Sequence, residues 1–290
     1  MEKHYKIHWK KGLDITPEIF VDLDNFHISE RNLLGYFVAS CTCGILPDSN
    51  FYIEKSIDND RIRIQHLECL ALTVDGYPIN IQRDTHYQKE LNLQDSSNSE
   101  YYVVLTVDPY STSQLDEKGL HVCPAYNLVL HNTTNPVKQG IPILKLIRNY
   151  SEWEFDQDYI PPSIALSSVD DIMRRYAEIN YVINTIIRKL PEDNPLFFHI
   201  TMFQLELQHY TSQESPKEFI LLLKKFCHIF QLYLKSEKNR DNIPEIKSFI
   251  DERYNHLEIG KLMKSGYECI MTVNENFDEK PEPVLDEIKI

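Results

Sequence analysis

Side chains of the kinds that bind zinc occur early in the sequence. Cys41-Thr42-Cys43 forms a Cys-x-Cys pair, and His66 and Cys69 follow it further along the chain. A structural zinc site needs four such donors that converge tetrahedrally, usually from tight Cys-x-x-Cys turns. The Cys-x-Cys spacing instead places both thiols on the apolar face of a strand, where free cysteines behave as small hydrophobic residues. We therefore expect buried thiols and no metal site, and whether the four side chains converge stays open.

A second group that could do chemistry consists of Asp22, Asp24 and His27. These residues fall on a predicted helix and resemble an acid/base group. Charged neighbours three positions apart on an exposed helical face more often form a solvated cluster. Because no nucleophile or phosphate-binding loop accompanies them, we assign no catalysis to this group.

Motifs of known enzyme classes are missing. The sequence has no Gly-rich phosphate loop, no nucleophile elbow and no His-Glu-x-x-His, and it contains only 8 glycines. A pair of carboxylates like that of a glycosidase carries no local signature and could be assembled from distant positions. We predict a non-enzymatic protein without catalytic residues or cofactors. The alternative is a carbohydrate-active enzyme or a ligand-binding β-sandwich with a helical appendage.

Composition indicates a folded, water-soluble chain. Of its 290 residues, 42% are hydrophobic and 26% are charged, and the net charge is −14. This charge would repel phosphate backbones, so nucleic acid is not an expected partner. No apolar run is long enough to cross a bilayer, and no apolar stretch follows the start Met, which predicts neither a membrane helix nor a signal peptide. Six cysteines without an export signal predict reduced thiols in the cytoplasm.

The first part of the chain has the pattern of an antiparallel β domain with one early helix. Thr16-Pro17-Glu18 supplies a helix start, with proline at the first position and acid in the first turn. Apolar residues alternate from Phe37 to Ile45, and again up to Val74, where Asp75-Gly76 predicts a tight hairpin turn. Further strands are expected at 79–81, 101–107, 126–130 and 141–147. The polar stretch 88–100 is expected to be a loop.

From Asp170 the apolar period changes to three and four residues, which predicts three helices. Pro191 ends the first, Asn194-Pro195 starts the second, and Ser215-Pro216 starts the third. Short connections between them favour an antiparallel bundle. A fourth helical stretch, 244–264, is expected to break near Gly260. The fold class is therefore α+β: an antiparallel β-sandwich shell domain at 1–165, a helical bundle at 166–267, and an acidic tail at 268–290 that is expected to be flexible.

The apolar stripes of these helices resemble the seams of oligomerising helices, although packing within one chain uses the same spacing. We expect them to form an interface between copies of the chain. The predicted seam consists of Ile172, Tyr176, Ile179, Ile183, Ile187, Leu207, Leu223 and Phe230.

Two segments carry a resemblance to a known family. Ile7–Leu13, followed by Thr16–Phe20 and Asp24, resembles the opening "W-x-x-G-M-x-L-x-P-Q-H-F-x-x-x-D" of TssK, the baseplate subunit of type VI secretion systems. Tyr159–Ile164 resembles the "Y/F-I-P-P" segment that precedes the helical bundle of that family. The matched positions, to which the resemblance gives structural or interface roles, are Trp9, Gly12, Leu13, Pro17, Phe20, Asp24, Tyr159, Ile160, Pro161 and Pro162.

The resemblance also implies roles for single residues. Trp9 and Phe20 would anchor an N-terminal strand and the helix, Gly12 would permit a close turn, and Pro161-Pro162 would form a stiff extended link between domains. The chain departs from the family at Glu18 and Ile19, where the family has glutamine and histidine. The C-terminal head domain of the family would need more residues than follow the third helix, so we expect a shortened, divergent TssK.

The function implied by the resemblance is that of a structural adaptor in bacterial secretion. Such a homotrimer links the TssF/TssG wedge to the membrane-associated complex through protein–protein interactions. Its partners would be copies of itself, TssF/TssG-like chains and a membrane-complex component. Its location would be the cytoplasmic baseplate docked at the inner membrane.

Overall fold

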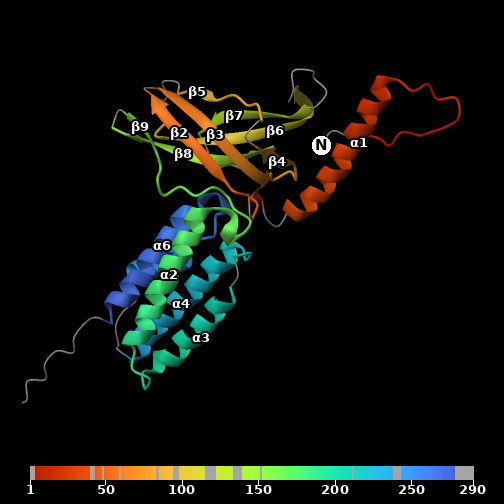
Figure 1. The fold of residues 1–290 in the computed structure, drawn as a ribbon. Coiled ribbons are helices and arrows are strands. Elements are labelled where there is room, and N and C mark those ends of the chain that lie inside the picture. The colour runs from red at the N-terminus through yellow and green to blue at the C-terminus, as the bar shows by residue number, and fades with distance from the viewer. Residues whose placement is uncertain are drawn as a thin grey trace, which may run out of the picture. The chain divides into compact units, whose positions relative to one another are not determined.

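The computed structural model describes residues 4–39, 43–47, 49–58, 60–82, 85–93, 98–114, 122–132, 139–150, 152–210, 212–237 and 243–277. The chain forms two compact units. The first contains Met1–Val169 and His256–Ile259, and the second contains Asp170–Asn255 and Gly260–Ile290. All described strands lie in the first unit, whereas the second is helical (Figure 1).

Helix α1, Pro17–Ala39, opens the first unit. It begins where the sequence predicts, with proline at its first position and Glu18 in its first turn. Its length was not predicted. The expected strand from Phe37 is wrong, because α1 continues through that residue to Ala39. A short apolar alternation does not distinguish a strand from the end of a helix. The strand that follows, β1, is limited to Gly44–Ile45.

The first sheet is built around one long strand, β3, Arg61–Leu72. Its antiparallel partners are β1, β2 (Tyr52–Asp58), β4 (Pro78–Ile81) and β5 (Glu90–Asn92). The turn between β3 and β4 contains Asp75-Gly76 as predicted, and Gly76 has a φ of 83°, which favours glycine. Strand β5 corrects the expectation that 88–100 is a loop throughout.

The second sheet is a four-stranded antiparallel sheet with the order β7-β6-β8-β9. Its strands are β6 (Glu100–Gln114), β7 (Val122–His131), β8 (Gly140–Asn149) and β9 (Glu152–Phe155). The first three contain the predicted strands at 101–107, 126–130 and 141–147. Strand β9 was not predicted, because Glu152–Phe155 is short and carries two glutamates.

Both sheets bury apolar side chains in the core of the first unit. The first contributes Ile62, Ile64 and Leu67, and the second contributes Val103 and Leu105, all at most 1% exposed. Polar contacts join the sheets near their margins. The backbone N–H of Asn80 on β4 donates to the Tyr126 hydroxyl on β7 over 3.2 Å, and the Lys55 ammonium lies 4.8 Å from the Phe155 ring centroid. Two antiparallel sheets with an early helix, followed by helices, confirm the α+β fold.

The second unit is a bundle of helices that run side by side (Figure 1). They are α2 (Asp170–Lys189), α3 (Pro195–His209), α4 (Pro216–Glu237), α5 (Pro244–Asp251) and α6 (Ile259–Glu275). Proline begins α3, α4 and α5, where its missing N–H costs no hydrogen bond. The side chain of Asn194 caps α3 by accepting from the N–H of Leu196 over 2.9 Å.

The end of the chain differs from the expectation. The break in the fourth helical stretch falls between α5 and α6 at 252–258, where a short 3-10 helix spans His256–Glu258. Gly260 lies in the first turn of α6, and α6 continues to Glu275, so the beginning of the expected tail is helical. A short 3-10 helix, Leu166–Ser168, precedes α2. No described helix is both long enough and apolar enough to cross a bilayer.

Candidate interaction surfaces

Strand β3 separates the candidate zinc ligands. A β-bulge pairs Glu54 with His66 but Lys55 with Ile64, so Gln65 is skipped and the buried face of β3 changes from even to odd positions. Cys69 is buried, with a pKa raised to about 12 by burial, whereas the His66 imidazole lies on the other face, 2.9 Å from the Glu68 carboxylate. Cys41 lies outside the described residues. Within those residues, no three His, Cys, Asp or Glu side chains are placed to hold a metal ion.

The acidic cluster on α1 lies at the surface of the first unit. Asp22, Asp24 and His27 are all exposed. A general acid requires a carboxyl group with a raised pKa. The pKa of Glu18 is lowered by a hydrogen bond from the Thr16 side chain, and that of Asp108 is lowered by the Ser111 hydroxyl. The lowered pKa values favour the ionised forms of Glu18 and Asp108, whereas a general acid must be protonated.

Most of the N-terminal residues that carry the family resemblance are exposed to solvent. Gly12 has a φ of 89° in a turn closed by the N–H of Leu13 and the carbonyl of Lys10 over 3.2 Å. Trp9 is 50% exposed and Phe20 is 54% exposed. Neither therefore anchors its segment inside the unit, as the resemblance implied. Leu13 is half-buried, whereas Pro17 and Asp24 are exposed.

The second family segment has an internal role. The carbonyl of Pro162 accepts from the N–H of Ile45 over 2.8 Å, and Ile164 donates back to the Ile45 carbonyl over 2.9 Å. These bonds pair the segment in parallel with β1. The Tyr159 hydroxyl donates to the Pro142 carbonyl over 3.1 Å, and Ile160, Pro161 and Pro162 are buried. The segment therefore closes the β unit and offers no binding surface.

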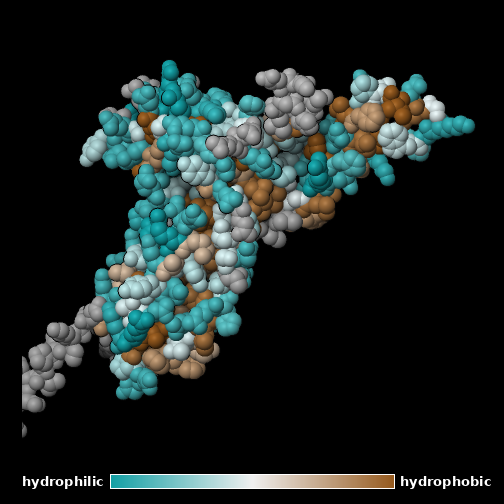
Figure 2. Space-filling view, in the orientation of Figure 1, coloured by the Kyte–Doolittle hydropathy of each residue, from teal (hydrophilic) through white to brown (hydrophobic). Residues whose placement is uncertain are grey.

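Helix α1 exposes apolar side chains at both of its ends. Only part of its circumference is covered, on the side where the Ser29 hydroxyl lies 3.3 Å from that of Tyr110 and where Asn32 is buried. Burial of exposed apolar side chains against another protein would remove them from water. Figure 2 shows the resulting brown patches over α1. The α1 apolar surface consists of Phe20, Val21, Leu33, Leu34, Tyr36 and Phe37, which are 45–68% exposed.

Beside this surface, a groove of about 680 Å³ lies between α1 and the β6–β7 hairpin. Its lining includes Val21 and Ile28 of α1 and Pro109, Tyr110 and Pro124 of the hairpin. The groove is mostly apolar and extends the α1 apolar surface toward the sheet.

The predicted oligomerisation seam is largely the core of the bundle. Ile172, Ile179, Ile183, Leu207, Leu223 and Phe230 are at most 1% exposed in a single chain. Tyr176 is half-buried and its hydroxyl donates to the Leu207 carbonyl over 3.2 Å, and Ile187 is also half-buried. The structure corrects the assignment of this seam to contacts between copies, because side chains that are covered within the chain cannot also cover a neighbour.

A different stripe of the bundle does remain uncovered. Helix α3 packs Leu196, Ile200, Phe203 and Leu207 inward. On its opposite side it exposes Phe198 (67%), Met202 (44%) and Leu205 (44%), which recur at helical spacing. We call these three residues the α3 stripe. The sequence contains this signal, because a helix that is apolar on two faces requires cover on both. Figure 2 shows apolar surface over the lower part of the bundle, where α3 lies.

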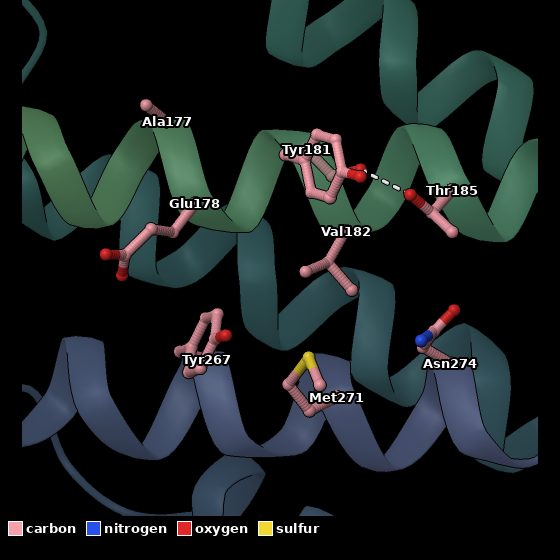
Figure 3. A pocket seen from close by; sticks show the side chains of 8 residues that line it. All are labelled: Ala177, Glu178, Tyr181, Val182, Thr185, Tyr267, Met271 and Asn274. Atoms are coloured by element: carbon pink, nitrogen blue, oxygen red, sulfur yellow. Dashed lines mark hydrogen bonds between the residues drawn. The ribbon is translucent and has the colours of Figure 1, made fainter.

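A shallow groove of about 480 Å³ lies between α2 and α6 in the same unit. Figure 3 shows Val182 of α2 pointing toward Met271 of α6, which carries Tyr267 as well. Its only carboxylate, Glu178, is bound by Arg175 at 3.2 Å. This α2–α6 groove could accept an apolar side chain. Its lining residues do not include the pair of carboxylates that a glycosidase needs.

Comparisons with known proteins agree with this architecture. No protein-family model matches the sequence, and no curated protein matches it. Solved structures do match. A chain of a type VI secretion TssK-TssF-TssG baseplate subcomplex aligns with 95% of this chain over its own full length, at 14% identity and a TM-score of 0.64.

Two structures of TssK itself match as well. A crystal structure of TssK aligns with 97% of this chain and 70% of its own length, at 12% identity and a TM-score of 0.65. TssK from the EAEC type VI system, bound to a nanobody, aligns with 87% of this chain and 69% of its own, at 14% identity and a TM-score of 0.61. Both of these structures are of TssK. The likeness to TssK that the short motifs indicated is therefore confirmed at the level of the fold: this chain has the fold of TssK.

Proposed function

We propose that the chain is a structural subunit of a type VI secretion baseplate and that it acts as an adaptor between other proteins. One observation carries the proposal: in a chain with the fold of TssK, two helices, α1 and α3, expose apolar faces that their own units leave uncovered. Such faces are typical of protein interfaces. No described groove combines these faces with a catalytic group.

The α3 stripe provides the self-association of this subunit. Long apolar side chains at helical spacing dock into grooves between helices. In our proposal, Phe198 and Met202 of one copy insert between α2 and α6 of the next copy, beside Met271. Different surfaces then meet at each contact, and such a heterologous interface closes into a ring when the rotation between copies allows it. A homotrimer is the ring implied by the resemblance.

The α1 apolar surface faces a different partner. The matched subcomplex contains TssF and TssG beside TssK. We assign α1 and the neighbouring groove to a TssF/TssG-like wedge chain. The same proposal places the subunit in the cytoplasm, in a baseplate docked at the inner membrane beside a membrane-complex component.

Co-purification tests the wedge contact. The chain is co-expressed with candidate TssF-like and TssG-like chains, and the α1 variants Phe20→Glu and Leu34→Glu are compared with wild type. We expect both variants to lose the wedge chains and to keep the mass of the assembly that wild type forms alone. The matched control is Tyr150→Glu, because Tyr150 is 99% exposed in the same unit but lies outside α1. Retention of wedge chains by both α1 variants would contradict the assignment.

A further inference from the structure

The α2–α6 groove lies between two helices that run in the same direction (Figure 3). At one end, the Arg175 guanidinium of α2 lies 5.8 Å from the Tyr267 ring centroid of α6. At the other end, the Lys189 ammonium donates to the Asn274 side chain over 2.8 Å. Asn274 belongs to the last turn of α6, so the helix ends beside this end of the groove. The segment 278–290, which lies outside the described residues, follows soon after in sequence.

Apolar side chains of the groove remain in contact with solvent. Tyr181 of α2 is 72% exposed, and Tyr267 and Met271 of α6 are half-buried. Val182 is buried and points across the groove toward Met271 (Figure 3). An apolar occupant would remove these surfaces from water, which favours its binding.

Basic residues flank the groove at both ends. Lys264 lies one turn before the groove on α6, and Arg188 lies one turn after it on α2, beside Lys189. The groove carboxylate is already bound by an arginine, and Glu275 at the end of α6 offsets only part of the positive charge. Although the whole chain has a net charge of −14, this groove therefore favours an acidic occupant.

The segment 278–290 has the complementary chemistry. Its sequence contains five carboxylates and two lysines. Val284, Leu285 and Ile288 recur at the spacing of one helical face. An acidic segment with apolar residues at this spacing matches an apolar groove between two helices.

We propose that the segment 278–290 binds in the α2–α6 groove of its own chain. Its apolar residues cover Tyr181 and Met271, and its carboxylates approach Arg188 and Lys264. The length is sufficient, because the segment would extend about 20 Å even as a helix, whereas the groove follows α6 for about 10 Å.

Occupancy of the groove by this segment has a consequence for self-association. The α3 stripe of a neighbouring copy is proposed to enter the same groove, and the two occupants exclude each other. The segment thus raises the concentration at which copies assemble. This consequence rests on the proposed function, whereas the binding of the segment does not.

Cross-linking of the full chain tests the binding. The Met202→Glu variant is used, because it is expected to be monomeric, and a carbodiimide joins carboxylates to nearby amines with loss of water. We expect Asp286 or Glu287 to be joined to Lys264, which lies about 15 Å along α6 from the end of the groove. Links to Lys217 should be rare, because this exposed lysine of α4 lies outside the groove. Mass spectrometry of mixed light and heavy-isotope chains shows whether each link lies within one chain.

Two further substitutions weaken the contact from either side. Tyr181→Ser removes a ring from the groove, and Ile288→Ser changes the segment while leaving every described residue unchanged. Each should reduce the links to Lys264 about tenfold, the effect of losing one buried apolar side chain. Leu221→Ser is the matched control, because Leu221 is 50% exposed on α4 outside the groove.

The contrary outcomes are equally specific. Links to Lys217 as frequent as links to Lys264 would overturn the proposal, as would links that join light to heavy chains. If Tyr181→Ser does not fold, Ile288→Ser decides alone, and unchanged links to Lys264 in that variant would overturn the proposal as well.

Light scattering on dilution tests the consequence for self-association. In a chain that is otherwise wild type, Ile288→Ser should form trimers at about tenfold lower concentration, because the competitor of the α3 stripe is weakened. Equal assembly of the two proteins would show that the segment does not exclude the stripe. If neither protein assembles, the proposed self-association is wrong, and the cross-links, which are measured on a monomer, still decide whether the segment binds.

Discussion

Gly35 of α1 lies directly against the backbone of Gly76 in the β3–β4 turn. A Cβ on Gly35 would overlap the Gly76 carbonyl oxygen, and a Cβ on Gly76 would overlap the backbone N of Tyr36. The missing side chains thus allow a helix and a turn to touch main chain to main chain.

This contact predicts the sign of the change in the free energy of unfolding when Gly35 is replaced by alanine. In an exposed helix, Gly→Ala stabilises by about 1 kcal/mol. At Gly35 we expect the opposite, a loss of about 1–3 kcal/mol, because the added methyl group must push α1 away from the turn. Urea unfolding of Gly35→Ala measures the change, with Glu30→Ala at an exposed position of α1 as the control. A Gly35→Ala variant more stable than wild type would show that the two backbones do not meet.

The second prediction concerns the segment that returns to the first unit from the end of the chain. The Tyr102 hydroxyl on β6 donates to the Glu258 carboxylate over 3.2 Å, and burial raises the pKa of Tyr102 to about 12. We expect Tyr102→Phe to cost about 0.5–1.5 kcal/mol, because the ring still packs against Tyr159 and only the hydrogen bond is lost. A double-mutant cycle with Glu258→Gln should show coupling between the two sites. Strictly additive effects would indicate that this bond does not form in solution.

The sequence predicted the regular parts of this fold, and the reasons are local. Helices α2, α3 and α4 have a clear apolar period, and α3 and α4 begin with proline. The Asp75-Gly76 turn requires a residue that accepts positive φ. Strands β2 and β5 were missed because β2 has no fully buried residue and β5 is only three residues long, and both are held by pairing with β3. The bulge at Gln65 shifts the buried face of β3: Ile62 and Ile64 are buried before it, and Leu67 and Cys69 are buried after it.

The candidate interface was harder to predict than the fold. Ile179 and Leu223 lie on apolar stripes, but periodicity does not reveal whether a stripe meets its own chain or a copy. The structure covers them within the bundle and leaves Phe198 and Met202 exposed instead. Trp9 and Phe20 were expected to be anchors, yet both are about half-exposed, because burial is a tertiary property that a short motif does not determine.

A third prediction follows from a buried histidine. His256 bonds the carbonyl of Cys43, and burial lowers the pKa of His256 below its usual value of 6.5. The unfolded chain therefore binds a proton at a higher pH than the folded chain does. Stability is fully present above about pH 6.5 and falls as the pH drops toward the folded pKa. We expect the urea midpoint to decrease between pH 7.5 and 5.5 by more in wild type than in His256→Gln. Equal decreases of the urea midpoint in the two proteins would show that His256 does not cause the loss of stability at low pH.

A substitution on the α3 stripe should separate copies of the chain without unfolding them. Met202 is 44% exposed on α3, so Met202→Glu leaves the core of the bundle intact but places a carboxylate in the proposed contact with the α2–α6 groove. Light scattering should show a trimer for wild type and a monomer for this variant. Leu232→Glu is the matched control, because Leu232 is 54% exposed on α4 outside the α3 stripe, and it should stay trimeric.

A compensating change tests which surfaces meet. In a heterologous ring, residue 202 of one copy faces residue 271 of the next, so adding Met271→Lys to Met202→Glu pairs opposite charges at every contact and should restore the trimer. If two α3 stripes met each other instead, the lysine at 271 would lie away from the interface and the double variant would remain monomeric. A wild-type chain that is monomeric at micromolar concentration would remove the basis of the proposed ring.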